Sequence, residues 1–165
     1  MDSEEKCNAW MLPIRNDFYV STGEFELVHV IMDWLRLYSV PYAPVYCKNV
    51  FVWQGQLIPL FDMEAYMRLY NDLPQDADRQ AGYICIVAYQ GSEEKQAIKF
   101  GGLLLKAMPF RITVKDDQMC DFPDDNVNWQ EIALSCFKES AFGTVPVLNL
   151  ENIFSRKPEV QVNAA

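Results

Sequence analysis

Residue types that carry out catalysis are sparse in this chain of 165 residues, and they do not cluster. Its single histidine, His29, follows Leu27 and Val28 in an apolar stretch, with no set of cysteine or aspartate ligands at the spacing of a zinc site. A zinc site or a histidine-based triad needs several such groups together, which favours a structural or surface role for His29. No nucleophile stands beside a base, so we expect no catalytic residue, no metal, no cofactor and no enzymatic activity.

The cysteines are an odd set of five without a CxxC motif, and most lie in apolar segments: Cys7, Cys47, Cys85, Cys120 and Cys136. In such segments a thiol behaves as a small hydrophobic group. Cys47 alone has an adjacent basic residue, Lys48, and one such neighbour activates a thiol only weakly. We therefore expect reduced, structural cysteines.

Acidic pairs and a glycine pair are the remaining candidates for chemistry. Residues 116–117 and 124–125 are aspartate pairs, and their lysine, glutamine, proline and asparagine neighbours are typical of solvated turns rather than of a metal site. Gly101 and Gly102 are followed by leucines instead of the Lys-Ser/Thr that completes a phosphate-binding loop. The glycine pair predicts a bulge or a close approach of strands.

Composition indicates a folded domain and excludes several partners. Half of the residues are hydrophobic, 13% are aromatic and 22% are charged, as in a globular protein. The net charge is −9, and no block of lysines or arginines occurs, which argues against nucleic acid and anionic lipid. The longest uncharged apolar run, residues 49–61, is too short for a membrane span, and the acidic N-terminus does not resemble a secretory signal. We expect a cytoplasmic protein that does not insert into membranes.

Short strand-like runs bounded by Gly, Pro, Asn or Asp predict an all-β fold. The clearest runs are residues 9–14, 17–21, 50–53, 56–60, 83–89, 96–105 and 110–114. Gln54 and Gly55 form a two-residue turn between two of them, where glycine can supply a positive φ. A second turn is expected at residues 90–94.

Other local signals refine this prediction. Pro59 cannot donate to a strand ladder, so its strand should lie at an edge or carry a bulge there. Asp62 can cap a short helix over residues 62–70. Residues 129–137 fit both helical and strand periods, and we favour a strand. A polar loop at residues 71–81 should separate two groups of strands, and the chain after Phe154 should fray.

The segment from Ala43 to Met67, APVYCKNVFVWQGQLIPLFDMEAYM, resembles the signature of CheW-like domains of bacterial chemosensory systems. That signature contains an Arg-Gly pair, a proline four residues later and an Asp-Leu pair that opens a helix. Gly55, Pro59 and Asp62 match it without gaps. Flanking segments resemble the opening hairpin of the divergent, pilus-associated ChpC-like and PilI-like members, and the closing strand and helix of the family.

This resemblance implies an all-β fold of two five-stranded SH3-like β-barrel subdomains around a shared core, with short helices. The domain would span residues 8–157, with a flexible tail at residues 158–165. It also implies a non-enzymatic adaptor that couples receptors to a CheA-type histidine kinase. The expected partners are the regulatory domain of that kinase, a methyl-accepting chemoreceptor or another CheW-like protein.

The expected protein-binding residues surround the signature turn: Trp53, Gln54, Gly55, Pro59 and Asp62. Trp53 is included because tryptophan often carries binding energy at interfaces when it faces outward. The family commonly has arginine at the position of Gln54 and glycine at that of Asn49. A neutral amide binds carboxylates more weakly than a guanidinium, which favours an auxiliary role in a pilus and twitching-motility pathway over ordinary receptor coupling.

A second hypothesis is a barrel that binds a small ligand or an oligonucleotide outside chemotaxis. Such barrels often present aromatic side chains to bases. An oligonucleotide binder should interleave lysine and arginine with these aromatic residues, and near Trp53 only Lys48 is close in sequence. Weak self-association through an exposed strand edge is left open.

Overall fold

Two β-sheets dominate the computed structural model, which describes residues 5–32, 35–71, 73, 82–91 and 97–155. The first, here called the terminal sheet, has the order β10 (Ala133–Glu139), β11 (Gly143–Leu148), β2 (Phe18–Gly23), β1 (Lys6–Arg15), β9 (Phe110–Lys115). The second, the central sheet, has the order β3 (Leu27–Ile31), β7 (Tyr83–Tyr89), β8 (Lys99–Leu105), β6 (Gln56–Phe61), β5 (Asn49–Trp53), β4 (Tyr38–Ser39).

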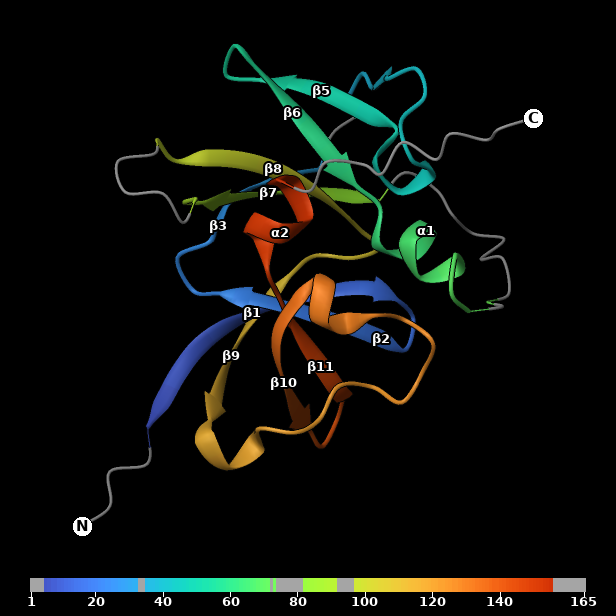
Figure 1. Cartoon of the computed structure of the whole chain (residues 1–165). Coiled ribbons are helices and arrows are strands. Elements are labelled where there is room, and N and C mark those ends of the chain that lie inside the picture. The colour runs from blue at the N-terminus through green and yellow to red at the C-terminus, as the bar shows by residue number, and fades with distance from the viewer. Residues whose placement is uncertain (1–4, 33–34, 72, 74–81, 92–96, 156–165) are drawn as a thin grey trace.

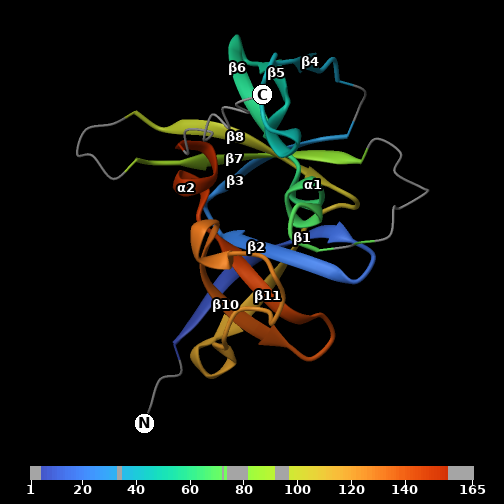
Figure 2. The ribbon, with the colours of Figure 1, turned by 45° about the vertical axis from the view of Figure 1, so that its right-hand side comes forward.

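The chain begins in the terminal sheet, builds the central sheet and then returns (Figure 1). Both sheets curl into subdomains, and the helices α1 (Met63–Arg68) and α2 (Leu150–Ser155) lie between them (Figure 2). The prediction of an all-β fold with two SH3-like subdomains and short helices is confirmed. The terminal sheet has the expected five strands, and the two-residue β4 gives the central sheet a sixth.

A shared core joins the subdomains, and strand alternation explains how it forms. On β7, Ile84 and Ile86 point into the central subdomain, whereas Cys85 and Val87 point the other way into the shared core. On β1, Met11 faces a separate core inside the terminal subdomain. Strands buried on both faces must be apolar at nearly every position, which is why these runs are continuous in the sequence.

The short helical elements follow their sequence signals. The Asp62 carboxylate accepts a hydrogen bond from the Ala65 amide at 3.1 Å, so its predicted capping role is confirmed. Between β9 and β11, residues 129–131 form a 3-10 turn and a strand begins at Ala133. The prediction of a strand over residues 129–137 is therefore wrong for residues 129–131 and correct from Ala133 onward.

Several local predictions need correction. The prediction that the strand containing Pro59 lies at a sheet edge is wrong, because β6 lies inside the central sheet. β6 pairs with β8 at Leu60 and Phe61, which follow the proline in the sequence. The glycine pair of β8 makes room for aromatic rings rather than for another strand, because a Cβ on Gly101 would lie 2.3 Å from the Phe154 ring. The strands β3 and β4 were not predicted.

Three expectations cannot be compared with the fold. Most of the predicted loop at residues 71–81, most of the turn at 90–94 and the tail from residue 156 onward lie outside the described residues.

A buried ion cluster also connects the two subdomains. Glu64 on α1 accepts hydrogen bonds from Arg15, at the end of β1, at 3.2 Å and from Arg68, one helical turn away, at 2.7 Å. The Glu64 side chain is only 8% exposed. Its carboxylate thus ties the helix that follows the signature hairpin to the terminal sheet.

Candidate protein-interaction site

The hairpin formed by β5 and β6 carries the residues of the signature turn. Trp53 pairs with Gln56, and Gln54 and Gly55 form the two-residue turn with φ values of 49° and 75°. Positive φ at both central positions is the geometry that follows the right-handed twist of the flanking strands. The prediction that Gly55 supplies a positive φ is confirmed, and Gln54 also adopts this conformation although it carries a side chain.

Replacing Gly55 with alanine should lower the free energy of unfolding by about 1–2 kcal/mol. No atom lies within 4 Å of the position that a Cβ on Gly55 would take, so the cost is that of the left-handed backbone alone. Denaturant unfolding of the wild-type and Gly55→Ala proteins measures this loss of stability. Gln54→Asn should raise the free energy of unfolding, since asparagine tolerates the left-handed conformation better than glutamine. Equal stability of the wild-type protein and both variants would contradict the positive φ values of this turn.

The two faces of this hairpin differ sharply. Phe51 and Ile58 pair across the strands and are buried in the central subdomain. Val52 and Leu57 pair on the opposite side and are 49% and 69% exposed. Val50, Pro59 and the Tyr38 side chain of β4 share that side by their register, and together these five residues are called the outer face: Tyr38, Val50, Val52, Leu57 and Pro59.

Trp53 does not belong to the outer face. It is half-buried, on the side of Phe51, and its ring lies edge-on to Phe100 at 5.4 Å and stacks on His29 at 6.2 Å. The structure therefore places Trp53 as a support beneath the hairpin rather than as the outward anchor expected from the sequence. Its contribution to binding stays a prediction.

Gln54 and Asp62 occupy two quite different environments. Gln54 is exposed at the tip of the hairpin, beyond the end of the outer face. Asp62 is half-buried, caps α1, and its amide donates to the Tyr46 carbonyl at 2.8 Å. The structure accounts for Asp62 by this local role, so it positions the binding region without lying on the outer face.

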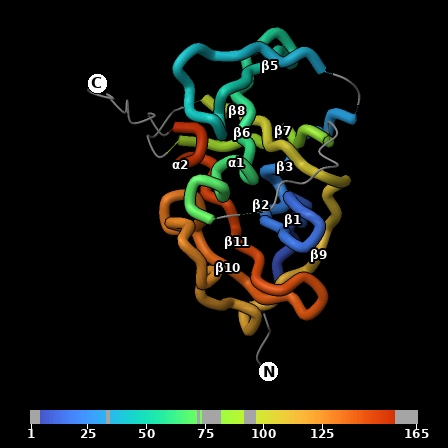
Figure 3. The backbone as a smooth tube through the Cα atoms, turned by 90° about the vertical axis from the view of Figure 1, so that its right-hand side faces the viewer, coloured from blue at the N-terminus to red at the C-terminus, as the bar shows by residue number. Residues whose placement is uncertain are grey.

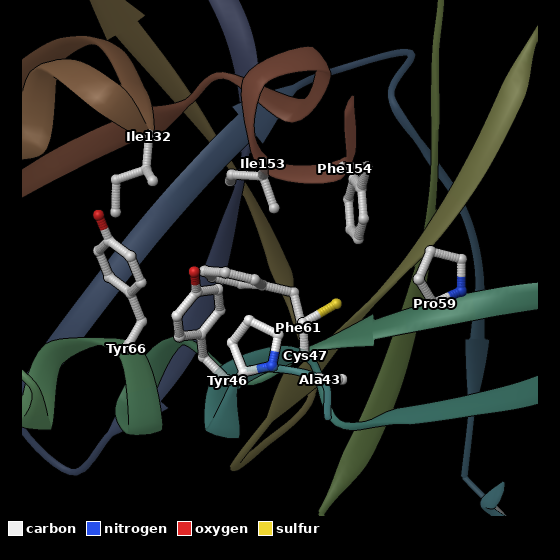
Figure 4. Close-up of a pocket in the computed structure, with 10 residues that line it drawn as sticks. Ala43, Tyr46, Cys47, Pro59, Phe61, Tyr66, Ile132, Ile153 and Phe154 are labelled. Atoms are coloured by element: carbon white, nitrogen blue, oxygen red, sulfur yellow. The ribbon is translucent and has the colours of Figure 1, made fainter. Parts of the chain in front are cut away.

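A pocket of about 120 Å³ lies where the outer face reaches the junction of the subdomains, and Pro59 is part of its lining. The central subdomain contributes Tyr46, Phe61 and Tyr66, and the other subdomain contributes Ile132, Ile153 and Phe154 (Figure 4). None of the lining residues is charged. Sequence reasoning missed this pocket because its walls come from segments that lie far apart in the chain.

The pocket wall contains one thiol, that of Cys47. Burial raises the pKa of the Cys47 thiol at the pocket wall, which disfavours the thiolate that a nucleophile needs. Among the described residues, no group of three or more His, Cys, Asp or Glu side chains is placed to hold a metal ion. Within the same residues, no helix has the length and hydropathy of a membrane span. The outer face thus leads, through Pro59, into a pocket without charged lining residues.

Comparisons with known proteins agree with this architecture. The family model described as "CheW-like domain" matches residues 24–158. The structure is similar to the crystal structure of the scaffolding protein TtCheW from Thermoanaerobacter tengcongensis, with a TM-score of 0.65 and 12% sequence identity. The similarity covers 88% of this chain and 90% of that one. No curated protein sequence matches the chain.

Proposed function

The chain belongs to the CheW-like domain family, and we propose that it is a non-enzymatic adaptor of a chemotaxis-type signalling complex. Its outer face docks onto the CheW-like regulatory domain of a CheA-type histidine kinase. The observation that carries this proposal is the exposed pair Val52 and Leu57 at the centre of the signature hairpin, 49% and 69% exposed.

The composition of this surface fits a protein partner. Its centre is aliphatic and uncharged, and at its margin the Arg36 guanidinium lies 5.1 Å from the centre of the Tyr38 ring. Arginine and tyrosine are enriched at interfaces, where the desolvated centre is depleted of charge. The strand β4 at the sheet edge has only two residues, so it offers little backbone for strand addition. Side-chain packing must therefore supply most of the affinity.

The residue at the tip of the hairpin bears on the signalling pathway in which the protein acts. Gln54 lies at the exposed hairpin tip, where family members commonly carry arginine, so a charged contact with a carboxylate is missing there. This substitution supports an auxiliary, pilus-associated role, with a chemoreceptor or another CheW-like protein as a secondary partner. We propose that the protein acts in the cytoplasm.

Calorimetric titration of the chain with the regulatory domain of a CheA-type kinase from the same organism tests the proposal. We expect micromolar affinity, which Trp53→Ala weakens because the hairpin loses the ring that supports it against Phe100. Gln54→Arg should strengthen binding, since a guanidinium binds carboxylates in a bidentate manner. Absence of binding by folded wild-type protein would leave the fold intact and refute the kinase as partner.

A further inference from the structure

The terminal subdomain closes along a seam between the chain that follows β9 and the edge strand β10. After the 3-10 turn Asp116–Gln118, Met119 forms an antiparallel bridge with Phe137. The Cys120 amide then donates to the Cys136 carbonyl at 3.0 Å. This short pairing completes the barrel that the five strands leave open between β9 and β10.

The same pairing brings two thiols together. Cys120 and Cys136 are directly opposite across the seam, and their side chains lie close enough to interact. Opposed residues in an antiparallel pair have Cα atoms roughly 5 Å apart, within the range that a disulfide spans. Both cysteines are reduced in the structure, so the bond is absent but the backbone is already in place for it.

The two thiols differ in access. Cys120 is half-buried and can be reached from solvent, whereas Cys136 is buried. Burial raises the pKa of Cys136 to about 12, and the hydrogen bond with Cys120 adds to the effect. Because Cys136 is buried and Cys120 is not, an oxidant in solution would meet Cys120 first.

We infer that Cys120 and Cys136 form a redox-sensitive dithiol, which a small disulfide such as oxidised glutathione converts into an intramolecular disulfide. The Cys120 thiolate attacks one glutathione sulfur, a mixed disulfide forms, and one glutathione leaves as thiolate and takes up a proton. Cys136 then loses its proton, attacks the Cys120 sulfur and releases the second glutathione. Two protein thiols are oxidised and one oxidised glutathione is reduced to two glutathione molecules.

The disulfide would fasten a segment that also reaches the other subdomain. Within the loop that it closes, the Asp125 carboxylate accepts hydrogen bonds from the Val127 amide and the Trp129 indole, both at 2.9 Å. The next residue, Asn126, donates its backbone amide to the Asn71 side chain just after α1, at 3.3 Å. In Figure 3 the orange chain that precedes β10 lies beside the green chain of α1. Oxidation would therefore stabilise both the barrel seam and a contact between the subdomains.

The experiment exposes the chain of 165 residues to oxidised glutathione, blocks the remaining thiols with iodoacetamide and maps the digested peptides by mass spectrometry. The expected product has lost about 2 Da and contains a peptide in which Cys120 is linked to Cys136. Its melting temperature should rise by roughly 5 °C and return when dithiothreitol is added.

Cys47→Ser is the matched control, because Cys47 is also half-buried and its removal should leave the cross-link unchanged. Cys120→Ser should abolish both the cross-link and the thermal shift. The peptide map of the wild-type protein tests the Cys120–Cys136 link independently of any variant. A stable glutathione adduct on Cys120, a cross-link that involves another cysteine, or no reaction would each overturn the inference.

Discussion

Glu64→Ala should lower the free energy of unfolding by about 3–5 kcal/mol, because it would break a largely buried ion cluster. The Glu64 carboxylate lies between two guanidinium groups, 3.2 Å from that of Arg15 and 2.7 Å from that of Arg68. Without it, both guanidinium groups would lose a charged acceptor in a region largely screened from water. Denaturant unfolding followed by tryptophan fluorescence measures the loss.

The size of this effect follows from burial rather than from the number of ion pairs. The side chains of Arg15 and Arg68 are 15% and 25% exposed, so their charges have lost most of their hydration. Glu64→Gln keeps the shape and one acceptor but removes the charge, and its cost should be intermediate. Because Arg15 belongs to the terminal sheet and Glu64 to α1, the loss should weaken the cohesion of the two subdomains.

The surface pair of Glu24 and Arg111 provides the control. Both side chains are partly exposed, 29% and 51%, so Glu24→Ala should cost less than about 1 kcal/mol. Equal losses for Glu24→Ala and Glu64→Ala would show that burial does not set the strength of the cluster.

The predictions that succeeded rest on local signals. Gly55 needs a positive φ in a two-residue turn, and Asp62 precedes a helix whose amides it can cap, so both could be placed from a few neighbouring residues. The continuous apolar runs predicted strands but could not reveal that β1 and β7 are buried on both faces. That property depends on the shared core, which forms only when both sheets are present.

The features that the sequence did not predict depend on contacts between distant segments. β3 contains exposed Val28 and His29 and owes its place to pairing with β7. Trp53 was expected to face outward, because alternation alone cannot say which side of an isolated hairpin is buried. The approach of Cys120 to Cys136 likewise depends on closure of the barrel, and the five cysteines show no spacing that indicates it.

Leu57→Asp should weaken binding to the kinase regulatory domain by at least ~30-fold, the largest expected effect on function. Leu57 is 69% exposed on the hairpin, so the substitution leaves the buried core of the free protein unchanged. In the complex, a carboxylate at the centre of an apolar contact would lose its hydration without a partner. Val52→Asp, on the directly opposed residue, should have a similar effect, and the two should not be additive because they disrupt the same contact.

Leu134→Asp separates this prediction from a general effect of added charge. Leu134 is 65% exposed on β10 of the terminal sheet, nearly the exposure of Leu57, and lies outside the outer face. Each variant adds one negative charge to a chain whose net charge is already −9, so long-range repulsion from an acidic partner would weaken both equally. Loss of binding only in Leu57→Asp places the contact on the outer face, whereas equal losses would remove the hairpin from the interface.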